Sequence, residues 1–376
     1  MKILITGGAG FIGSNLAKKL VKNGHSVKVL DNISPQIHNN GLNSFLVKQL
    51  PSEVDLIIGD VQNRVDLQKS IKNIDTVVHL AAETGTGQSM YQIERYTNVN
   101  IGATSLLLDI LANEKHSVKK VIIASSRAIY GEGKYIDSEG KFHYPKERSE
   151  HNMQQGQFEP LNPKTQKPLS MVLTDESSMI HPTSVYGITK QVQEQMVLTV
   201  CKSIGIDAIA FRYQNVYGVG QSLTNPYTGI LSIFSGQLLN GQEVNIFEDG
   251  KETRDFVNVS DVVDATILGI EYPNKIVDSF NVGTGVASTV IEVAELLKIN
   301  YQSDAKISVT GNYRIGDIRH NAADISKIKA VLGFEPKISL ETGIKDFCRW
   351  VEQNKPEKSN AFENSLQEMS NKGLLK

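Results

Sequence analysis

Residues 2–13 read Lys-Ile-Leu-Ile-Thr-Gly-Gly-Ala-Gly-Phe-Ile-Gly, a short apolar run that ends in glycines and leads into a helical pattern. Another apolar run, Ser26 to Leu30, follows this pattern, so the first 30 residues predict a β-α-β unit. Gly7, Gly10 and Gly13, three of the four glycines in this stretch, lie where the first strand meets the helix, and there glycine permits a tight turn and the close approach of backbone to a pyrophosphate. The N-terminus of the helix would then face the negative charge. We therefore predict a dinucleotide site whose first contacts are Gly7, Gly10, Phe11, Ile12 and Gly13.

Further strand-like runs recur at 54–58, 76–80, 120–125, 208–211 and 279–282, with helical patterns between most of them. Strands that alternate with helices predict an α/β fold with a doubly wound parallel (Rossmann) sheet, whose ligand crevice lies at the carboxyl ends of the strands. From about Gly218 the elements become shorter and more mixed. We expect a nucleotide-binding domain over 1–217, a mainly substrate-binding mixed α/β lobe over 218–350 with a strand near 279–282 that returns to the main sheet, and a C-terminal tail over 351–376.

Two segments do not follow the strand and helix pattern. Residues 131–182 are polar with little periodicity, which fits either a long loop or a small subdomain inserted into the first domain. In the tail, apolar residues recur at roughly helical spacing, which fits either an amphipathic helix packed on the body or a solvated end. These tail residues are Phe362, Leu366, Met369 and Leu374.

Composition excludes several classes of function. The 376 residues include 39 basic and 41 acidic side chains, so the net charge of −2 predicts neither a nucleic-acid surface nor polybasic membrane binding. Cys201 and Cys348 are the only cysteines, which excludes a disulfide framework and an all-cysteine metal cluster and favours a reducing compartment. Because we find no secretion signal and no apolar run of about 18 residues, we expect a soluble, cytoplasmic protein without a bound metal.

The second strand ends at Asp31, about 20 residues beyond the glycines, where a carboxylate accepts hydrogen bonds from an adenosine ribose. Residues 32–40 contain no Arg or Lys that could receive a 2′-phosphate, so NAD is favoured over NADP. Asp60 fits either an adenine contact or an ordinary carboxylate at a strand end. His79 alone is more typical of a hydrogen-bonded core histidine than of a catalytic group. The other expected cofactor contacts are Asn32, Val61, Leu80, Ala81 and Ala82.

Tyr186 and Lys190 lie four residues apart in a helical pattern, and residues at this spacing share one face of a helix. The ammonium of Lys190 can therefore lie beneath the phenol of Tyr186 and favour its ionised form. Tyrosine alone titrates near about 10 and would be a poor base at neutral pH. A lone Tyr-x-x-x-Lys is more often a solvated helix face, but together with Ser126 and the glycine stretch it predicts a nicotinamide site.

The order of motifs along the chain resembles the extended short-chain dehydrogenase/reductases of the nucleotide-sugar epimerase and dehydratase group. The motifs that carry this resemblance are the glycine stretch, Asp31, Asp60-Val61, His79-Leu-Ala-Ala82, Asn100, Ser125-Ser126, Tyr186-x-x-x-Lys190, Arg212-Tyr-Gln-Asn215, Arg254-Asp-Phe-Val257 and Arg314-x-Gly-Asp317. The resemblance implies that Tyr186 is the general base. It also implies that Lys190 binds the nicotinamide ribose and lowers the pKa of Tyr186, and that Ser126 hydrogen-bonds the reacting oxygen.

Further positions match through the same resemblance. Asn100 would order the polar network beneath the nicotinamide, although a helix cap is the simpler interpretation of this residue alone. Arginine pairs two phosphate oxygens at once, which suits a sugar diphosphate. The residues expected to contact the nucleotide-sugar substrate are Ser126, Arg127, Tyr186, Asn215, Arg254, Arg314 and Asp317.

The two residues after Ser126 separate the chemistries of the group. Dehydratases place Asp-Glu there and decarboxylating relatives place Glu at the second position, whereas this chain has Arg127 and Ala128, so both reactions are disfavoured. Epimerisation at C3 or C5 would need an added acid/base pair, often with Cys, but Cys201 and Cys348 lie outside the matched motifs. The resemblance therefore implies reversible oxidation at C4, rotation of the 4-keto sugar in the pocket, and regeneration of NAD in each cycle.

Within the group, four parts of the chain are most similar to bacterial dTDP-L-rhamnose 4-epimerases. These parts are the stretch from Ser125 to Gly133, the long insertion with Arg148-Ser-Glu150, the stretch from Leu223 to Gly229 and the chain end. Such enzymes make 6-deoxy-L-talose donors. They often carry cysteine pairs in the insertion, whereas residues 141–168 here contain none. The alternatives are a UDP-hexose 4-epimerase acting on glucose/galactose or N-acetylhexosamine donors, a nucleotide-sugar reductase or dehydrogenase with net NAD(P) turnover, and a non-enzymatic NAD-binding regulator. The resemblance also implies a homodimer that pairs helices near 100–113 and 184–203, whose apolar positions fit ordinary core equally well.

Overall fold

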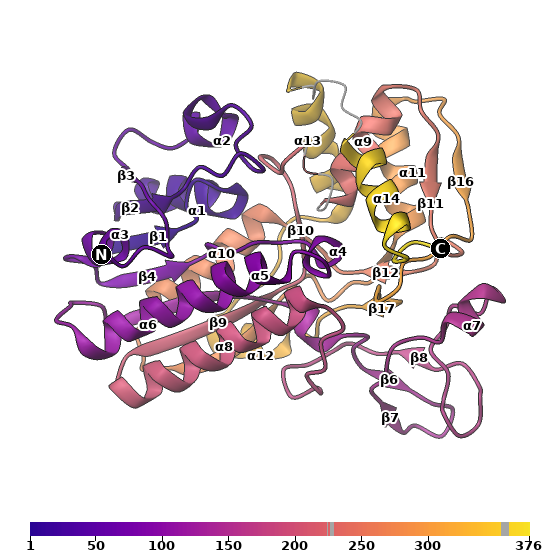
Figure 1. The fold of residues 1–376 in the computed structure, drawn as a ribbon, viewed down its shortest axis with the longest axis horizontal. Coiled ribbons are helices and arrows are strands. Elements are labelled where there is room, and N and C mark those ends of the chain that lie inside the picture. Colours follow the sequence, from indigo (N-terminus) through magenta and orange to yellow (C-terminus); the bar gives the residue numbers. More distant parts are fainter. Residues whose placement is uncertain (224, 226–228, 355–360) are drawn as a thin grey trace.

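The structure is a computed structural model, and it describes the whole chain except residues 224, 226–228 and 355–360 and the side chains of 361–363 (Figure 1). A seven-stranded sheet, parallel throughout, forms its centre and confirms the predicted doubly wound α/β fold. In spatial order the strands are β3 (Asp55–Ile58), β2 (Ser26–Asp31), β1 (Lys2–Thr6), β4 (Thr76–His79), β5 (Lys120–Ser126), β9 (Asp207–Tyr213) and β14 (Val277–Val282).

Helices cover both faces of this sheet, which explains why its strands read as continuous apolar runs. Successive side chains of a strand point to opposite faces, so Ile3 and Ile5 of β1 belong to one buried cluster and Leu4 to the other. On the first face lie α1 (Phe11–Lys22), α10 (Val259–Glu271) and α12 (Ser326–Leu332). On the second lie α3 (Arg64–Ile71), α6 (Ala103–Asn113) and α8 (Val185–Ile204), with the short elements α4 (Thr86–Ser89), α5 (Ile93–Tyr96) and the π-helix η2 (Thr97–Gly102) leading into α6. The remaining short elements before α3 are η1 (Gly41–Asn43) and α2 (Phe45–Lys48).

A second, smaller body lies beside the carboxyl ends of the sheet strands (Figure 1). It has its own apolar core, in which Phe234, Leu297 and Phe347 are buried. Its helices are α9 (Ile230–Leu239), α11 (Val290–Tyr301) and α13 (Leu340–Gln353). Its strands are β10 (Asn215–Tyr217), β11 (Val244–Ile246), β12 (Thr253–Arg254), β13 (Phe256–Asn258), β15 (Ser288–Thr289), β16 (Ile307–Val309) and β17 (His320–Asn321).

The polar insertion is a small subdomain rather than a long loop. It projects from the body in Figure 1 and follows the 3₁₀-helix η3 (Arg127–Tyr130). Its elements are the antiparallel strands β6 (Tyr135–Ile136), β7 (Phe142–His143) and β8 (Ser170–Met171) and the helix α7 (Glu150–Gln154). Buried charges anchor it: Arg148 lies 3.1 Å from Glu132 and 2.7 Å from Glu248.

The tail returns to the body as helix α14 (Ala361–Asn371), so the packed alternative holds for this segment. Met369 is buried, and Lys376 exchanges two backbone hydrogen bonds with Tyr313 of the second body. The side chain of Phe362 and most of the stretch from Leu223 to Gly229 lie outside the described residues. Within the described part of the chain, every helix is too short or too polar to cross a bilayer.

Candidate active site

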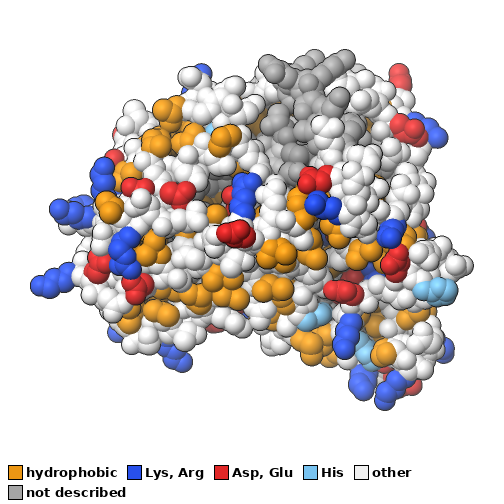
Figure 2. Space-filling view, viewed as in Figure 1, with side chains coloured by type: hydrophobic (Ala, Val, Ile, Leu, Met, Phe, Trp, Pro, Cys, Tyr) orange, Lys and Arg blue, Asp and Glu red, His pale blue; other side chains and the backbone are white. Residues whose placement is uncertain are grey.

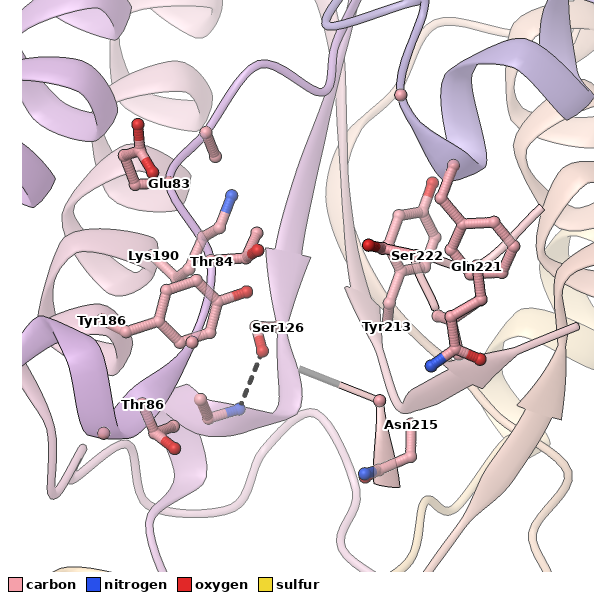
Figure 3. A pocket seen from close by; sticks show the side chains of 18 of the residues that line it. Glu83, Thr84, Thr86, Ser126, Tyr186, Lys190, Tyr213, Asn215, Gln221 and Ser222 are labelled. Carbon is pink, nitrogen blue, oxygen red and sulfur yellow. Dashed lines mark hydrogen bonds between the residues drawn. The ribbon is translucent and has the colours of Figure 1, made fainter. Parts of the chain in front are cut away.

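One cavity of about 630 Å³ lies between the carboxyl ends of the sheet strands and the second body. All the predicted site residues except Asn100 line this cavity, although they come from segments spread over more than 300 positions of the chain. Figure 3 shows part of the cavity, with Ser126, Tyr186 and Lys190 on one side and Asn215 and Gln221 across from them. The expectation of a single crevice at this edge of the sheet therefore agrees with the structure.

The glycine stretch forms the turn between β1 and α1. Gly7 adopts a left-handed conformation with φ of +67°, and a Cβ there would lie 2.8 Å from the Cα of Ala81. At Gly13 a Cβ would lie 2.5 Å from the carbonyl oxygen of Gly7. No side chain caps α1 and no acidic residue lies in its first turn, so its N-terminal N–H groups and dipole suit a pyrophosphate.

The adenosine end of the cavity is polar. The carboxylate of Asp31 accepts hydrogen bonds from the backbone N–H groups of Ala9 (3.0 Å) and Ile33 (2.9 Å), which holds it at the end of β2. Each of its oxygens keeps a lone pair for a ribose hydroxyl. Asn32 donates to Asp60 at 3.2 Å, so these two predicted contacts form one polar pair. The free lone pairs of these carboxylates therefore fit the hydroxyl groups of NAD.

His38 is a cavity residue that sequence reasoning missed. Its Nε2 lies 3.9 Å from Asp31, and its Nδ1 shares a hydrogen bond of 2.9 Å with Ser44. Burial lowers the pKa of His38, an effect that outweighs the nearby negative charge of Asp31. The loop after β2 therefore brings a largely neutral imidazole next to the carboxylate of Asp31. The motif spacing indicates only whether Arg or Lys lies in residues 32–40, so it contains no signal for a histidine at this place.

Tyr186 lies in the first turn of α8, a helix whose N-cap Ser184 accepts a hydrogen bond from the N–H of Gly187 at 3.1 Å. Lys190 follows one turn later, and its Nζ lies 5.9 Å from the centre of the Tyr186 ring. The ammonium donates to the carbonyl oxygen of Ala124 at 3.0 Å. Burial lowers the pKa of Lys190 to about 7. The predicted pair is therefore assembled, with the lysine directed toward strand β5.

The charge of a residue that the sequence did not link to Tyr186 also acts on its pKa. Burial raises the pKa of Tyr186, and this rise is opposed first by a hydrogen bond with Ser126 and then by the positive charge of Arg127. The sequence-based expectation assigned this lowering to Lys190. In the structure Lys190 donates to a carbonyl group and burial lowers its pKa, while the positive charge of Arg127 opposes the rise in the pKa of Tyr186. The effect of Lys190 on Tyr186 stays a prediction.

Asn100 is fully buried within η2 and does not line the cavity. Its Nδ2 donates to Glu83 O (3.1 Å) and Thr189 Oγ1 (2.9 Å), and its Oδ1 accepts from the N–H of Glu83 (2.8 Å). It therefore ties the loop after β4 to α8, and π-helical turns often occur at functional sites. This geometry agrees with an ordering role.

His79 is a hydrogen-bonded core residue, the simpler of its two interpretations. Its ring nitrogens share hydrogen bonds with Thr6 Oγ1 (2.7 Å) and Thr104 Oγ1 (3.1 Å). Burial, with a smaller effect from Lys190, lowers its pKa to about 3. His79 therefore stays neutral at physiological pH.

The far wall of the cavity carries the predicted arginines. Arg254 donates to the carbonyl oxygens of Thr253, Ile318 and Arg319, so most of its donors already have protein partners. Arg314 instead stacks over the ring of Phe247 at 4.7 Å. Its Nε is buried and finds no hydrogen-bond partner among the described residues, and the same holds for Oδ1 of the cavity residue Asn215. Such groups remain available to a polar ligand.

The charges of four arginines act on the carboxylate of Asp317. Burial would raise the pKa of Asp317, but the arginine charges outweigh it and the pKa is lowered. Arg127, Arg254 and Arg314 line the cavity here together with Asp317, Glu248 and Glu252, so a diphosphate would find arginine donors rather than a surface of net positive charge. In order of their effect on Asp317 the arginines are Arg254, Arg314, Arg148 and Arg127.

The cavity also contains residues that were not among the predicted site residues. Figure 3 shows Thr84 and Thr86 near Tyr186, and Tyr213 and Ser222 on the opposite side. Met369 and Leu374 reach the cavity from the C-terminal segment, and their only signal in the sequence was apolar spacing. Among the residues that the structure describes, no group of three or more His, Cys, Asp or Glu side chains is arranged to hold a metal ion.

Comparison with known proteins agrees with this geometry. Residues 3–283 match the NAD dependent epimerase/dehydratase family. A dTDP-L-rhamnose 4-epimerase of Burkholderia thailandensis is 35% identical over 354 residues, which cover 94% of this chain and 95% of that protein. A putative UDP-glucose 4-epimerase of Methanocaldococcus jannaschii is 30% identical over 356 residues, which cover 94% and 99%.

Solved structures are similar over the same span. The crystal structure of a UDP-glucose 4-epimerase of Thermotoga maritima with UDP-glucose has a TM-score of 0.77 at 32% identity and covers 95% of this chain and 100% of that one. That of a UDP-glucuronic acid 4-epimerase of Bacillus cereus with UDP-glucuronic acid and NAD has a TM-score of 0.76 at 26% identity, with coverage of 94% and 100%. The chain therefore belongs to the NAD-dependent epimerase/dehydratase family.

Proposed function

We propose that the protein is an NAD-dependent nucleotide-sugar 4-epimerase, and that its substrate pair is dTDP-L-rhamnose and dTDP-6-deoxy-L-talose. One observation carries the proposal: Ser126, Tyr186 and Lys190 face a cavity whose opposite wall concentrates arginines. The relative named dTDP-L-rhamnose 4-epimerase supports the choice of sugar. A UDP-hexose 4-epimerase is the alternative, because UDP-glucose 4-epimerases are also similar over nearly the whole chain.

Tyr186 would take the proton from the C4 hydroxyl, with Ser126 hydrogen-bonded to the same oxygen. Because burial raises the pKa of Tyr186, the phenolate depends on the Ser126 hydrogen bond and on the charge of Arg127. Bound NAD would supply the capacity to accept a hydride from C4 and to return it. After the 4-keto sugar has turned over, Tyr186 would give its proton back to the oxygen at C4.

The cofactor would lie along the sheet edge. The turn with Gly7, Gly10 and Gly13 would hold the pyrophosphate at the start of α1, and Asp31 would hold the adenosine ribose. Asn32, Asp60 and Val61 would contact the adenine, while Leu80, Ala81 and Ala82 would follow the backbone of the cofactor. Lys190 would hydrogen-bond the nicotinamide ribose, and Asn100 would keep α8 and the loop after β4 in place.

The nucleotide end of the sugar donor would lie at the far wall. Arg314 is the best-placed phosphate ligand because its Nε has no protein partner among the described residues. Arg254 would contribute mainly charge, since three carbonyl oxygens already use its donors. Asp317 would offset the repulsion between these arginines, and Asn215 would hydrogen-bond the substrate from the adjacent strand β10. In this arrangement residues 1–217 bind the cofactor and 218–350 bind most of the substrate.

We also propose a homodimer in which α6 and α8 pair with their copies in a partner subunit. Ile188 on α8 and Ile93 on the neighbouring α5 are about half exposed, at 47% and 54%. In Figure 2 apolar side chains gather over the lower face of the sheet body, where Figure 1 shows α6 and α8. Light scattering that finds a monomer at micromolar concentration would contradict this assembly.

The function is tested by incubating the full-length protein with dTDP-, UDP- and GDP-sugars and identifying stereoisomeric products by NMR. We expect interconversion of dTDP-L-rhamnose with its C4 epimer and no net formation of NADH. Tyr186→Phe should lower kcat by at least about 100-fold and retain NAD, because it removes only the acid/base oxygen. Tyr272→Phe, away from the cavity, is the matched control.

The outcomes separate the alternatives. Turnover restricted to UDP-hexoses would favour the second substrate class, and stoichiometric NADH formation would indicate a dehydrogenase. Wild-type turnover by Tyr186→Phe on every accepted sugar would refute the catalytic assignment.

A further inference from the structure

The last residues of the chain contact all three parts of the molecule around the cavity. Figure 1 shows α14 in front of the second body, close to α4 of the sheet body. Lys376 lies 3.6 Å from Glu150 of the insertion. This placement would be unusual for a solvated tail, because chain ends are poorly ordered unless specific contacts hold them.

On the sheet body, the C-terminal segment contacts α4 and the residues just after it. Tyr91 donates to Glu368 at 3.1 Å, and the ammonium of Lys372 lies 4.9 Å from the centre of the Tyr91 ring. A Cβ at Gly87 would lie 3.2 Å from the sulfur of Met369, so the missing side chain lets Met369 approach α4 closely.

On the second body, the chain end pairs as a short antiparallel strand. Leu375 forms a bridge with Arg314, and the flanking backbone hydrogen bonds are Ile315 N to Leu374 O (3.0 Å) and Lys376 N to Tyr313 O (3.0 Å). The strand that carries Arg314, the best-placed phosphate ligand, is thus held by the last three residues of the chain.

Between these two attachments, Met369 and Leu374 line the cavity. The two residues are linked directly, since Leu374 N donates to Met369 O at 2.9 Å. Gly87 and Ile315 also line the cavity and lie next to these two residues, since Met369 approaches Gly87 and the N–H of Ile315 donates to Leu374 O, so the four form an apolar patch beside Thr84 and Thr86. It is also close to the reacting end, because Ser89 of α4 accepts a hydrogen bond from the backbone N–H of Tyr186 at 3.0 Å.

We propose that Met369 and Leu374 of the C-terminal segment form the apolar wall of the hexose subsite and select a sugar whose C6 is a methyl group. The inference rests on the proposed function, because it places C4 of the hexose at Tyr186. C5, the ring neighbour of C4, carries C6, so C6 lies within two bonds of the reacting carbon. This apolar wall favours a 6-deoxy sugar, because a C6 hydroxyl that faces Met369 and Leu374 would lose its water without gaining a hydrogen bond from either side chain.

The test compares two substrates that differ only at C6, dTDP-L-rhamnose and dTDP-L-mannose, with full-length enzyme carrying NAD. A hydrophobic pocket discriminates against an added hydroxyl by roughly 100-fold at most, so wild type should prefer the 6-deoxy sugar in kcat/KM by about 10- to 100-fold. Met369→Ala and Leu374→Ala should each reduce this preference by roughly 10-fold, because the wall becomes wider and wetter. Met369→Gln, which keeps the side-chain length but adds an amide, should reduce it further by raising kcat/KM for the 6-hydroxy sugar.

Leu366→Ala is the matched control, because it truncates an apolar residue of the same helix that does not line the cavity. It should leave the preference unchanged even if it lowers the melting temperature as much as Met369→Ala. An unchanged preference in Met369→Gln and Leu374→Ala, or an equal loss in Leu366→Ala, would overturn the inference.

The proposed function can fail separately. If wild type epimerises neither sugar, the 4-epimerase assignment to these donors falls, and the same variants are then compared by equilibrium binding of the two nucleotide sugars. A binding preference for the 6-deoxy sugar that Met369→Gln abolishes would still support the apolar wall, and its persistence in that variant would refute it.

Discussion

Replacing Gly13 by alanine separates the geometry of the glycine turn from ordinary helix propensity. Gly13 lies in the first turn of α1, and a Cβ there would lie 2.5 Å from Gly7 O, 2.6 Å from Gly8 Cα and 2.9 Å from Gly8 C. All three atoms belong to the backbone of the turn, so no side chain can rotate away to relieve the contact. The turn itself must move.

The expected magnitude follows from two opposing effects. Overpacking of a rigid site costs about 1–3 kcal/mol, and because backbone must shift we expect the upper end of this range. Alanine regains about 1 kcal/mol of helix propensity relative to glycine. The free energy of unfolding should therefore fall by about 2 kcal/mol. NAD affinity should fall by at least about 10-fold, because misplacement of a binding group by about 1 Å is costly.

Gly236→Ala is the matched control. Gly236 lies within α9, and a Cβ there would meet no atom within 4 Å, so this variant should be stabilised by about 1 kcal/mol and keep its NAD. Denaturant unfolding of the NAD-free protein and titration with NAD measure the two effects separately. If Gly13→Ala matched Gly236→Ala in stability and bound NAD as tightly as wild type, the steric argument for the turn would be refuted.

Three further predictions concern buried charge. Glu194→Ala should destabilise the fold by about 3–5 kcal/mol in denaturant unfolding, because it removes the only carboxylate that pairs with the buried guanidinium of Arg212, at 2.6 Å, among the described residues, and leaves Arg212 only neutral acceptors. An effect below about 1 kcal/mol would contradict this prediction. Burial lowers the pKa of Lys190 to about 7 in the folded protein, whereas an unfolded lysine titrates near about 10.4. Between these two pH values the unfolded chain binds one proton more than the folded protein, so the free energy of unfolding should rise with pH. Wild type should gain up to about 1.4 kcal/mol per pH unit over this window relative to Lys190→Met, and parallel stability curves would exclude the buried titration. Arg127→Gln should move the rising limb of the pH profile of kcat/KM to higher pH, because the pKa of Tyr186 rises without the cation. Arg127→Lys should move this limb back. If the limb does not move in Arg127→Gln, Arg127 does not act on Tyr186.

Much of the site could be predicted because its signals are local. The turn around Gly7 and Gly13 and the carboxylate of Asp31 follow from strand and helix periodicity, which parallel pairing then brings to one edge of the sheet. The pair Tyr186 and Lys190 follows from helical spacing alone.

Other parts of the site could not be predicted, because they depend on burial and on contacts across the chain. The lowered pKa of Lys190 arises from desolvation, which no spacing reveals. Arg254 and Arg314 look alike in the sequence, yet only the packing of backbone carbonyls around Arg254 shows that its donors are already used. The anchoring of the insertion through Arg148 and Glu248 joins residues 100 positions apart.

The sequence by itself determined the parallel sheet, the dinucleotide turn and the identity of the residues at the reacting edge, because periodicity and short spacings act within one or two elements. Only the tertiary structure decided that the charge of Arg127 acts on the pKa of Tyr186, that Nε of Arg314 is left without a partner among the described residues, and that Met369 and Leu374 line the cavity. Electrostatic interactions depend on distance and desolvation in space, and both arise only when segments far apart in the chain are packed together.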